Sequence, residues 1–84
     1  MGIVKETKYM YFELVEKKPK TNKYRITNKK WGDQLGIIEW YSSWRQYIFE
    51  DDYGCVFNHT CLNEIAEFLK ELNTKHKEKK NQGL

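Results

Sequence analysis

The stretch Leu35–Phe49, LGIIEWYSSWRQYIF, holds five of the thirteen aromatic residues in a chain of 84. Tryptophan, tyrosine and isoleucine favour the half-buried surface of a pleated sheet, and a pair of serines favours a turn. The stretch therefore predicts a β-hairpin with strands over 36–41 and 44–49 and a turn at Ser42-Ser43. We expect the rest of the chain to be organised around this hairpin.

The two faces of the predicted hairpin have different roles, because side chains alternate across a strand. Ile38 and Trp40 share one face of the first strand, while Arg45, Tyr47 and Phe49 share a face of the return strand. One hairpin face can supply a core. The other still carries aromatic and guanidinium groups, which is the feature of this sequence that points to function.

Further strands are predicted on both sides of the hairpin. Apolar and polar residues alternate over 9–15 and 23–28, which is the period of a half-buried strand. A charged loop that contains the single proline separates these two segments. A short strand is predicted over 55–57, so the sheet should have four or five strands.

The spacing of apolar residues changes after residue 60. It becomes helical and gives one broad apolar face, formed by Cys61, Leu62, Ile65, Ala66, Phe68, Leu69 and Leu72. Asn58 or Thr60 can cap the start of this helix, because a short side-chain oxygen accepts an N–H of the first turn. A helix over about 59–73 with a single apolar face needs a partner surface, and the sheet supplies it.

The sequence thus predicts an α+β fold, in which one C-terminal helix packs on one face of an antiparallel sheet. At 84 residues the chain should form a single domain over 1–84, with a folded core over about 8–73. The charged tail, 74–84, should be a fraying helix end or disordered. The uncovered face of the sheet is left for solvent, a ligand or a second subunit.

Composition and charge limit where in the cell the protein is expected and which kinds of partner it can bind. Two cysteines are too few for a disulfide framework, and no apolar run approaches the roughly 20 residues of a membrane span. We therefore expect a cytoplasmic protein with no membrane partner. Residues 1–23 and 74–84 each carry a charge of +3, whereas residues 24–73 carry −3. An acidic middle favours a small anion held in a local pocket over a long nucleic acid, although the terminal lysines could attract polyanions.

The candidate binding residues come from the hairpin and the strand before it. Stacking on a planar ring is predicted for the aromatic members and phosphate contact for the arginines, so that the set is Trp40, Tyr41, Trp44, Tyr47, Arg45 and Arg25. A structural alternative remains open. Ile38 and Trp40 could be core residues beneath the helix, and Arg45 could pack on a ring as a cation–π pair.

Metal binding and catalysis have weaker support in the sequence. Cys55, His59 and Cys61 match no zinc spacing, and Cys61 falls on the apolar face of the helix, where a thiol acts as a small hydrophobe. Asp51-Asp52 lies in a predicted turn, where paired carboxylates are usually solvated. No nucleophile elbow or phosphate loop is present in the sequence. We expect a binding protein with no metal and no cofactor, and not an enzyme.

Spaced residues run from the hairpin into the helix in the pattern GxIxWYxxWRxYxF, from Gly36 to Phe49, followed by CLxxIxxFL, from Cys61 to Leu69. In this pattern the chain resembles small, mostly uncharacterised proteins of phages and prophages. It departs from the pattern in its more acidic turn at Asp51-Asp52. In size and in its aromatic and arginine-bearing face, the chain is also similar to phage anti-defence proteins that sequester nucleotide-derived immune signals.

The second resemblance implies a homo-oligomer in the cytoplasm of a bacterial host. Its ligand would be a nucleotide-derived molecule of the cyclic oligonucleotide or cyclic ADP-ribose type, bound without hydrolysis. Two rivals use the same aromatic face. One is a protein-interaction module or inhibitor, and the other is a binder of single-stranded nucleic acid.

Overall fold

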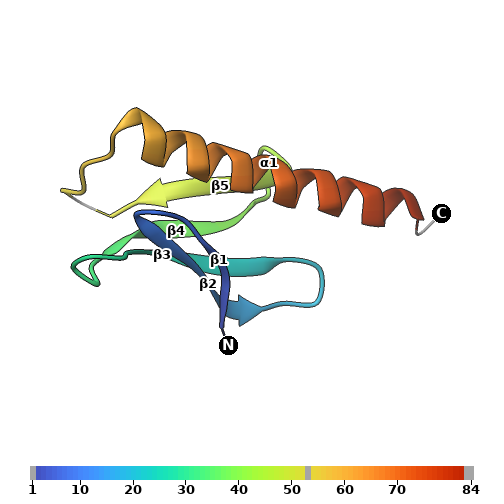
Figure 1. Ribbon diagram of the computed structural model, residues 1–84. Coiled ribbons are helices and arrows are strands. Elements are labelled where there is room, and N and C mark those ends of the chain that lie inside the picture. Colours follow the sequence, from blue (N-terminus) through green and yellow to red (C-terminus); the bar gives the residue numbers. More distant parts are fainter. Residues whose placement is uncertain (1, 53, 83–84) are drawn as a thin grey trace.

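The computed structural model describes residues 2–52 and 54–82 of the chain. The elements follow one another as β1 (Ile3–Glu6), β2 (Met10–Lys17), β3 (Asn22–Asn28), β4 (Gln34–Tyr41), β5 (Gln46–Asp51) and α1 (His59–Gln82). The strands form one antiparallel sheet in the order β1-β2-β3-β4-β5. Figure 1 shows α1 lying over one face of this sheet, along β5. The predicted α+β fold is confirmed.

The outer strands differ from the prediction. β1 was not predicted, because the strand has only four residues, IVKE, and two of them are charged. It gains strand structure by pairing with the edge of β2, where the Leu14 N–H also donates to the Gly2 carbonyl at 2.9 Å. Residues 55–57 were predicted as a strand and are irregular instead. Phe57 still packs edge-on against Phe49, with ring centroids 5.5 Å apart.

The hairpin is confirmed, but its turn spans four residues, 42–45, instead of the serine pair alone. The N–H groups of Trp44 and Arg45 donate to the Tyr41 and Ser42 carbonyls at 3.2 and 3.3 Å. Arg45 has φ of 52°, in the left-handed region that L residues rarely adopt. Strand alternation therefore resumes only at Gln46, and Trp44 and Arg45 belong to the turn.

The core lies between the covered face of the sheet and α1. Met10, Phe12, Ile26 and Ile38 are fully buried. Phe68 of α1 enters this layer, with its ring centroid 4.7 Å from that of Phe12 and 5.3 Å from that of Tyr24. Aromatic packing thus joins the helix to the middle strands of the sheet, which are far from the helix in sequence.

The helix begins as predicted and ends later. The Asn58 side-chain oxygen accepts the Cys61 N–H at 2.9 Å, so Asn58 is the cap. The buried face is narrower than predicted, because Ile65 and Phe68 are covered by the sheet whereas Leu62 is half exposed. The tail was predicted to fray or to be disordered from residue 74, but α1 continues to Gln82.

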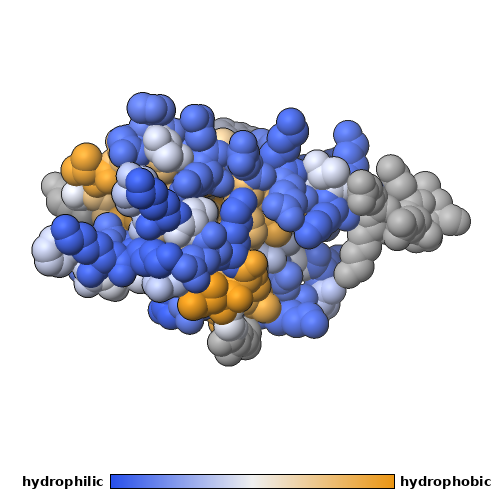
Figure 2. All heavy atoms as spheres, in the orientation of Figure 1, coloured by the Kyte–Doolittle hydropathy of each residue, from blue (hydrophilic) through white to orange (hydrophobic). Residues whose placement is uncertain are grey.

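Apolar side chains that remain exposed are scattered over the surface. On the face shown in Figure 2, hydrophilic residues predominate and the apolar residues gather in small separate areas. The most exposed aliphatic residues are Ile3, Val4, Val56 and Leu62. They lie in the N-terminal strand, in the connection before α1 and in the first turn of α1, away from the hairpin.

Candidate functional site

The structure separates the six residues that the sequence grouped as one site. Trp40 and Tyr47 are directly paired across β4 and β5 and point toward α1. Tyr41 is on the opposite face, where its ring meets that of Trp44 edge-on at 5.2 Å. The hairpin therefore presents two surfaces, and a ligand cannot contact all of its aromatic rings at once.

Tyr47 is a core residue with only 6% of its surface exposed. Its hydroxyl accepts the backbone N–H of Asn22 at 3.1 Å, and its own N–H donates to the Asn73 side-chain oxygen at 2.7 Å. Burial raises the pKa of the phenol above its ordinary value of 10.0. Tyr47 thus joins β5 to β3 and to α1 and has no free surface on which to stack a ligand.

Arg25 is engaged on the uncovered face of the sheet. Its Nη2 and Nε atoms donate to one oxygen of Glu13 at 2.6 and 3.1 Å, and the two residues are direct partners across β2 and β3. Such a cross-strand pair stabilises the sheet modestly and neutralises the guanidinium charge. Arg25 therefore does not contribute to a site at the hairpin turn.

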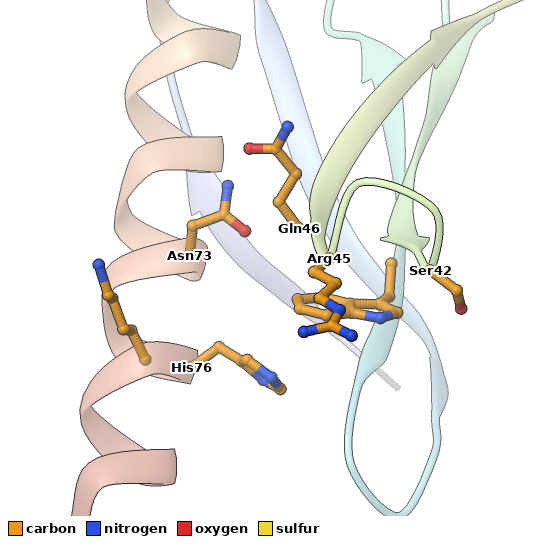
Figure 3. Close-up of a pocket in the computed structure, with 7 residues that line it drawn as sticks. Ser42, Arg45, Gln46, Asn73 and His76 are labelled. Carbon is orange, nitrogen blue, oxygen red and sulfur yellow. The ribbon is translucent and has the colours of Figure 1, made fainter.

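A cleft of about 600 Å³ lies between the hairpin turn and the C-terminal half of α1. Figure 3 shows Ser42, Arg45 and Gln46 on the hairpin side and Asn73 and His76 on the helix side, with the side chains of Asn73 and His76 pointing toward the hairpin. The complete lining in the described part of the chain is Trp40, Ser42, Arg45, Gln46, Asn73, His76 and Lys77. Two of the predicted residues, Trp40 and Arg45, are thus brought together here.

The lining of the cleft is rich in hydrogen-bond donors and positive charge. Arg45 and Lys77 are both basic residues, and none of the described lining residues is acidic. Because the Asn73 side-chain oxygen accepts the Tyr47 N–H, its amide hydrogens are the groups left for a ligand. The cleft is therefore complementary to an anion that carries several acceptor oxygens.

Trp40 forms an aromatic wall of the cleft. Its ring centroid lies 4.4 Å from that of His76, with an angle of 39° between the planes, and 5.5 Å from that of Tyr47. His76 thus occupies part of the indole surface, and the remainder lines the cleft. A planar ligand ring can contact this remaining surface or displace the imidazole.

Sequence reasoning missed the helical half of the cleft. Asn73 was assigned to the end of the helix, and His76 and Lys77 to a charged tail whose lysines could attract polyanions, so none of the three was predicted to line a site with the hairpin. Their spacing of three and four residues places them on one side of a helix, and this is the signal that could have found them. The signal depends on the helix continuing past residue 73, as it does here.

The cysteines and the acidic turn, which were considered for metal binding and catalysis, make structural contacts. Cys55 donates its thiol to the Gln34 carbonyl at 3.7 Å, and Cys61 packs against the core. The Asp52 carboxylate accepts both hydrogen bonds of the Gln34 amide, at 3.1 and 3.3 Å. Among the side chains that the structure describes, in 2–52 and 54–77, no cluster of His, Cys, Asp or Glu could hold a metal ion. In the described part of the chain, none of the helices has the length and apolar character of a membrane span.

Comparison with known proteins gives one informative match. No family model and no solved structure matches the chain. The chain is 32% identical over 76 residues to an uncharacterised 9.3 kDa protein of Acholeplasma phage L2, and the match covers 89% of this chain and 97% of the phage protein. The two proteins thus correspond along almost their full lengths. This chain belongs to the same family of small phage proteins as the uncharacterised 9.3 kDa protein of phage L2.

Proposed function

We propose that this protein binds and sequesters a small nucleotide-derived anion in the cleft between the hairpin turn and α1, without converting it. The observation that carries this proposal is that Arg45 and Lys77 line the same cleft as the Trp40 indole, with no acidic residue among the described lining. Membership in a phage protein family supports a role during infection, in which removal of a host signalling nucleotide would be useful.

Five of the lining residues have roles in binding that their chemistry suggests. Arg45 offers a rigid fork of donors that matches a phosphate, and Lys77 adds a second charge. The amides of Gln46 and Asn73 can donate to ribose or ring oxygens, while Trp40 contacts the ring. Compared with the set predicted from sequence, this assignment keeps two residues, Trp40 and Arg45.

Sequestration is the favoured activity because most of the lining consists of hydrogen-bond donors and an aromatic surface. Arginine and amide groups bind a phosphate ester but supply no general base that would activate a nucleophile. His76 is the titratable group nearest to Trp40, and its ring is packed against the indole. A protein that only binds its ligand must be made in amounts comparable to that ligand, which a chain of 84 residues permits at low cost.

Ligand release followed by mass spectrometry tests this proposal. The purified protein is incubated with a mixture of linear and cyclic nucleotides, washed, denatured and analysed. Recovery of an intact nucleotide in stoichiometric amount is the expected result. Recovery of a converted product would show an enzyme, and recovery of nothing from any mixture would remove the proposal.

A matched pair of arginine variants then tests the location of the site. Arg45→Lys keeps the charge but loses the fork, so binding of the released nucleotide should weaken by about 1–3 kcal/mol, with little change in melting temperature. Arg25→Lys is the control, because Arg25 pairs with Glu13 outside the cleft. Titration calorimetry should show normal affinity for Arg25→Lys. Equal affinity in both variants would place the ligand elsewhere.

A protein-interaction function is the second candidate, and it has its own surface. Tyr41 and Trp44 are 42% and 66% exposed and form an edge-on pair on the uncovered side of the hairpin. Tryptophan and tyrosine are enriched among the residues that dominate protein interfaces. The homo-oligomer predicted from sequence would use this pair. Sedimentation of the wild type and of Trp44→Ala separates self-association from binding to another protein.

A further inference from the structure

A second basic and aromatic surface lies at the other end of the sheet from the cleft. The β1–β2 turn and the β3–β4 loop meet there around a hollow of about 330 Å³. The cleft is next to the β4–β5 turn, so the two sites are separated by the length of β4. We call this surface the turn patch, and its lining residues are Lys8, Tyr9, Asn28, Lys29, Lys30 and Trp31.

The turn patch presents two exposed rings, each beside an ammonium group. Trp31 is 70% exposed and Tyr9 is 41% exposed. The Lys30 Nζ atom lies 5.1 Å from the centroid of the Trp31 ring, and the Lys8 Nζ atom lies 5.4 Å from that of Tyr9. Within the described residues, neither lysine forms an ion pair with a carboxylate. Both charges are therefore available to an anionic partner.

Hydrogen bonds to the side chain and the backbone of Asn28 hold the β3–β4 loop in shape. The Asn28 side-chain oxygen accepts the N–H groups of Lys30 and Trp31 at 2.8 and 3.0 Å. Gly32 has φ of 77°, which glycine adopts without strain, and its N–H donates to the Asn28 carbonyl at 2.8 Å. The Trp31 ring is thus carried on an ordered turn, so a partner does not have to order the backbone on binding.

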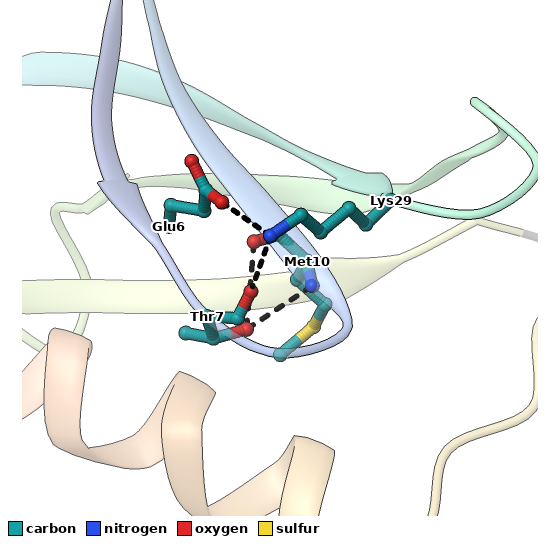
Figure 4. Close-up of polar contacts among 4 residues, drawn as sticks. All are labelled: Glu6, Thr7, Met10 and Lys29. Atoms are coloured by element: carbon teal, nitrogen blue, oxygen red, sulfur yellow. Dashed lines mark hydrogen bonds and ion pairs between the residues drawn. The ribbon is translucent and has the colours of Figure 1, made fainter.

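Lys29 joins the two segments of the turn patch. Its backbone N–H donates to the Tyr9 carbonyl at 2.8 Å, and its ammonium group pairs with Glu6 and reaches the Thr7 carbonyl at 3.4 Å (Figure 4). The hydrogen bond and charge of Glu6 raise the pKa of Lys29. Lys29 is therefore a structural lysine, which fixes Tyr9 and Trp31 around one hollow.

We propose that the turn patch binds single-stranded nucleic acid, with bases stacked on Trp31 and Tyr9 and phosphates held by Lys30 and Lys8. Each ring with its neighbouring cation matches one base with its neighbouring phosphate, and such contacts are tolerant of sequence. Duplex bases are already stacked and cannot use exposed rings in this way. A flat anionic bilayer would not fill a hollow. This inference does not rest on the proposed function of the cleft.

The test is the binding of a fluorescent oligo-dT strand of about 15 nucleotides, followed by anisotropy at about 0.1 M salt. Trp31→Ala and the double variant Lys8→Glu/Lys30→Glu should each weaken binding roughly tenfold or more, whereas Trp31→Phe should retain most of it. The matched control is Lys18→Glu/Lys20→Glu in the β2–β3 turn, which changes the net charge equally at the other end of the sheet. Its affinity should stay within about twofold of the wild type at this salt concentration.

Two results would overturn the proposal. The first is no oligonucleotide binding by the wild type; in that case, binding to phosphatidylserine vesicles that is lost in Trp31→Ala would identify a lipid surface as the partner instead. The second is an equal loss in both double variants, which would indicate general charge attraction. Circular dichroism of each variant checks that the fold is retained, as expected for side chains this exposed.

Discussion

At the residue scale, Tyr47 shows how burial changes the role of a side chain that looks like a binding residue in the sequence. In the folded sheet it lies directly across from Trp40, on the face that α1 covers. The sequence does not reveal that Asn22 and Asn73 complete its hydrogen bonds from two distant segments. Those contacts exist only after β3 and α1 are packed, so local patterns carry no sign of them.

The buried phenol of Tyr47 predicts a dependence of stability on alkaline pH. Burial raises its pKa in the folded state, so the associated stabilisation is complete below the ordinary value of 10.0 and is lost as the pH rises through the raised pKa. Absorbance titration of tyrosinate should show a group that ionises above pH 10.0. Tyr47→Phe should remove that group from the titration. A titration curve that Tyr47→Phe leaves unchanged above this pH would contradict the expectation.

At the element scale, α1 is held by fewer residues than its apolar pattern suggests. Phe68 is 6% exposed and packs on Phe12 and Tyr24, so Phe68→Ala should lower the free energy of unfolding by about 3–5 kcal/mol. Leu62 belongs to the same predicted apolar face but is 50% exposed. Leu62→Ala is thus the control and should cost less than about 1 kcal/mol. Urea denaturation measures both, and similar losses would mean that the helix is seated differently.

The continuation of α1 past residue 73 gives a second prediction for this element. Removing 74–84 deletes His76 and Lys77 from the cleft, so binding of the released nucleotide should fall sharply. Removing only 78–84 keeps both residues and should leave binding nearly unchanged. Calorimetry on the two truncated chains makes the comparison. Normal binding after removal of 74–84 would exclude the helical half of the cleft from the site.

At the scale of the whole molecule, the two proposed sites should act independently. The cleft and the turn patch lie at opposite ends of β4 and share no lining residue in the described chain. A saturating concentration of the cleft nucleotide should therefore leave the affinity for labelled oligo-dT unchanged. Anisotropy titrations with and without the nucleotide measure this. Full competition between the two ligands would mean that they share one site.

Across the whole molecule, the parts that can be predicted from sequence are those with a regular spacing of apolar residues. Alternation with a period of two and the helical spacing after residue 60 predict the central strands, the helix and their packing. β1 depends on pairing with β2 and has no pattern of its own. The turn was misplaced because Arg45 adopts a left-handed backbone that its residue type does not signal. Half of the cleft comes from a polar stretch of α1, where apolar periodicity is absent.

The hydrogen bond from the Tyr47 N–H to Asn73 has a consequence for how this protein avoids aggregation. β5 is an edge strand, and a bare edge is a template on which another chain can add a strand. At Tyr47 the donor that an incoming strand would use is already taken by a side chain of α1. Strand addition at this position therefore requires that α1 first move away from the sheet. The packed helix thus opposes the addition of another chain to β5 at Tyr47.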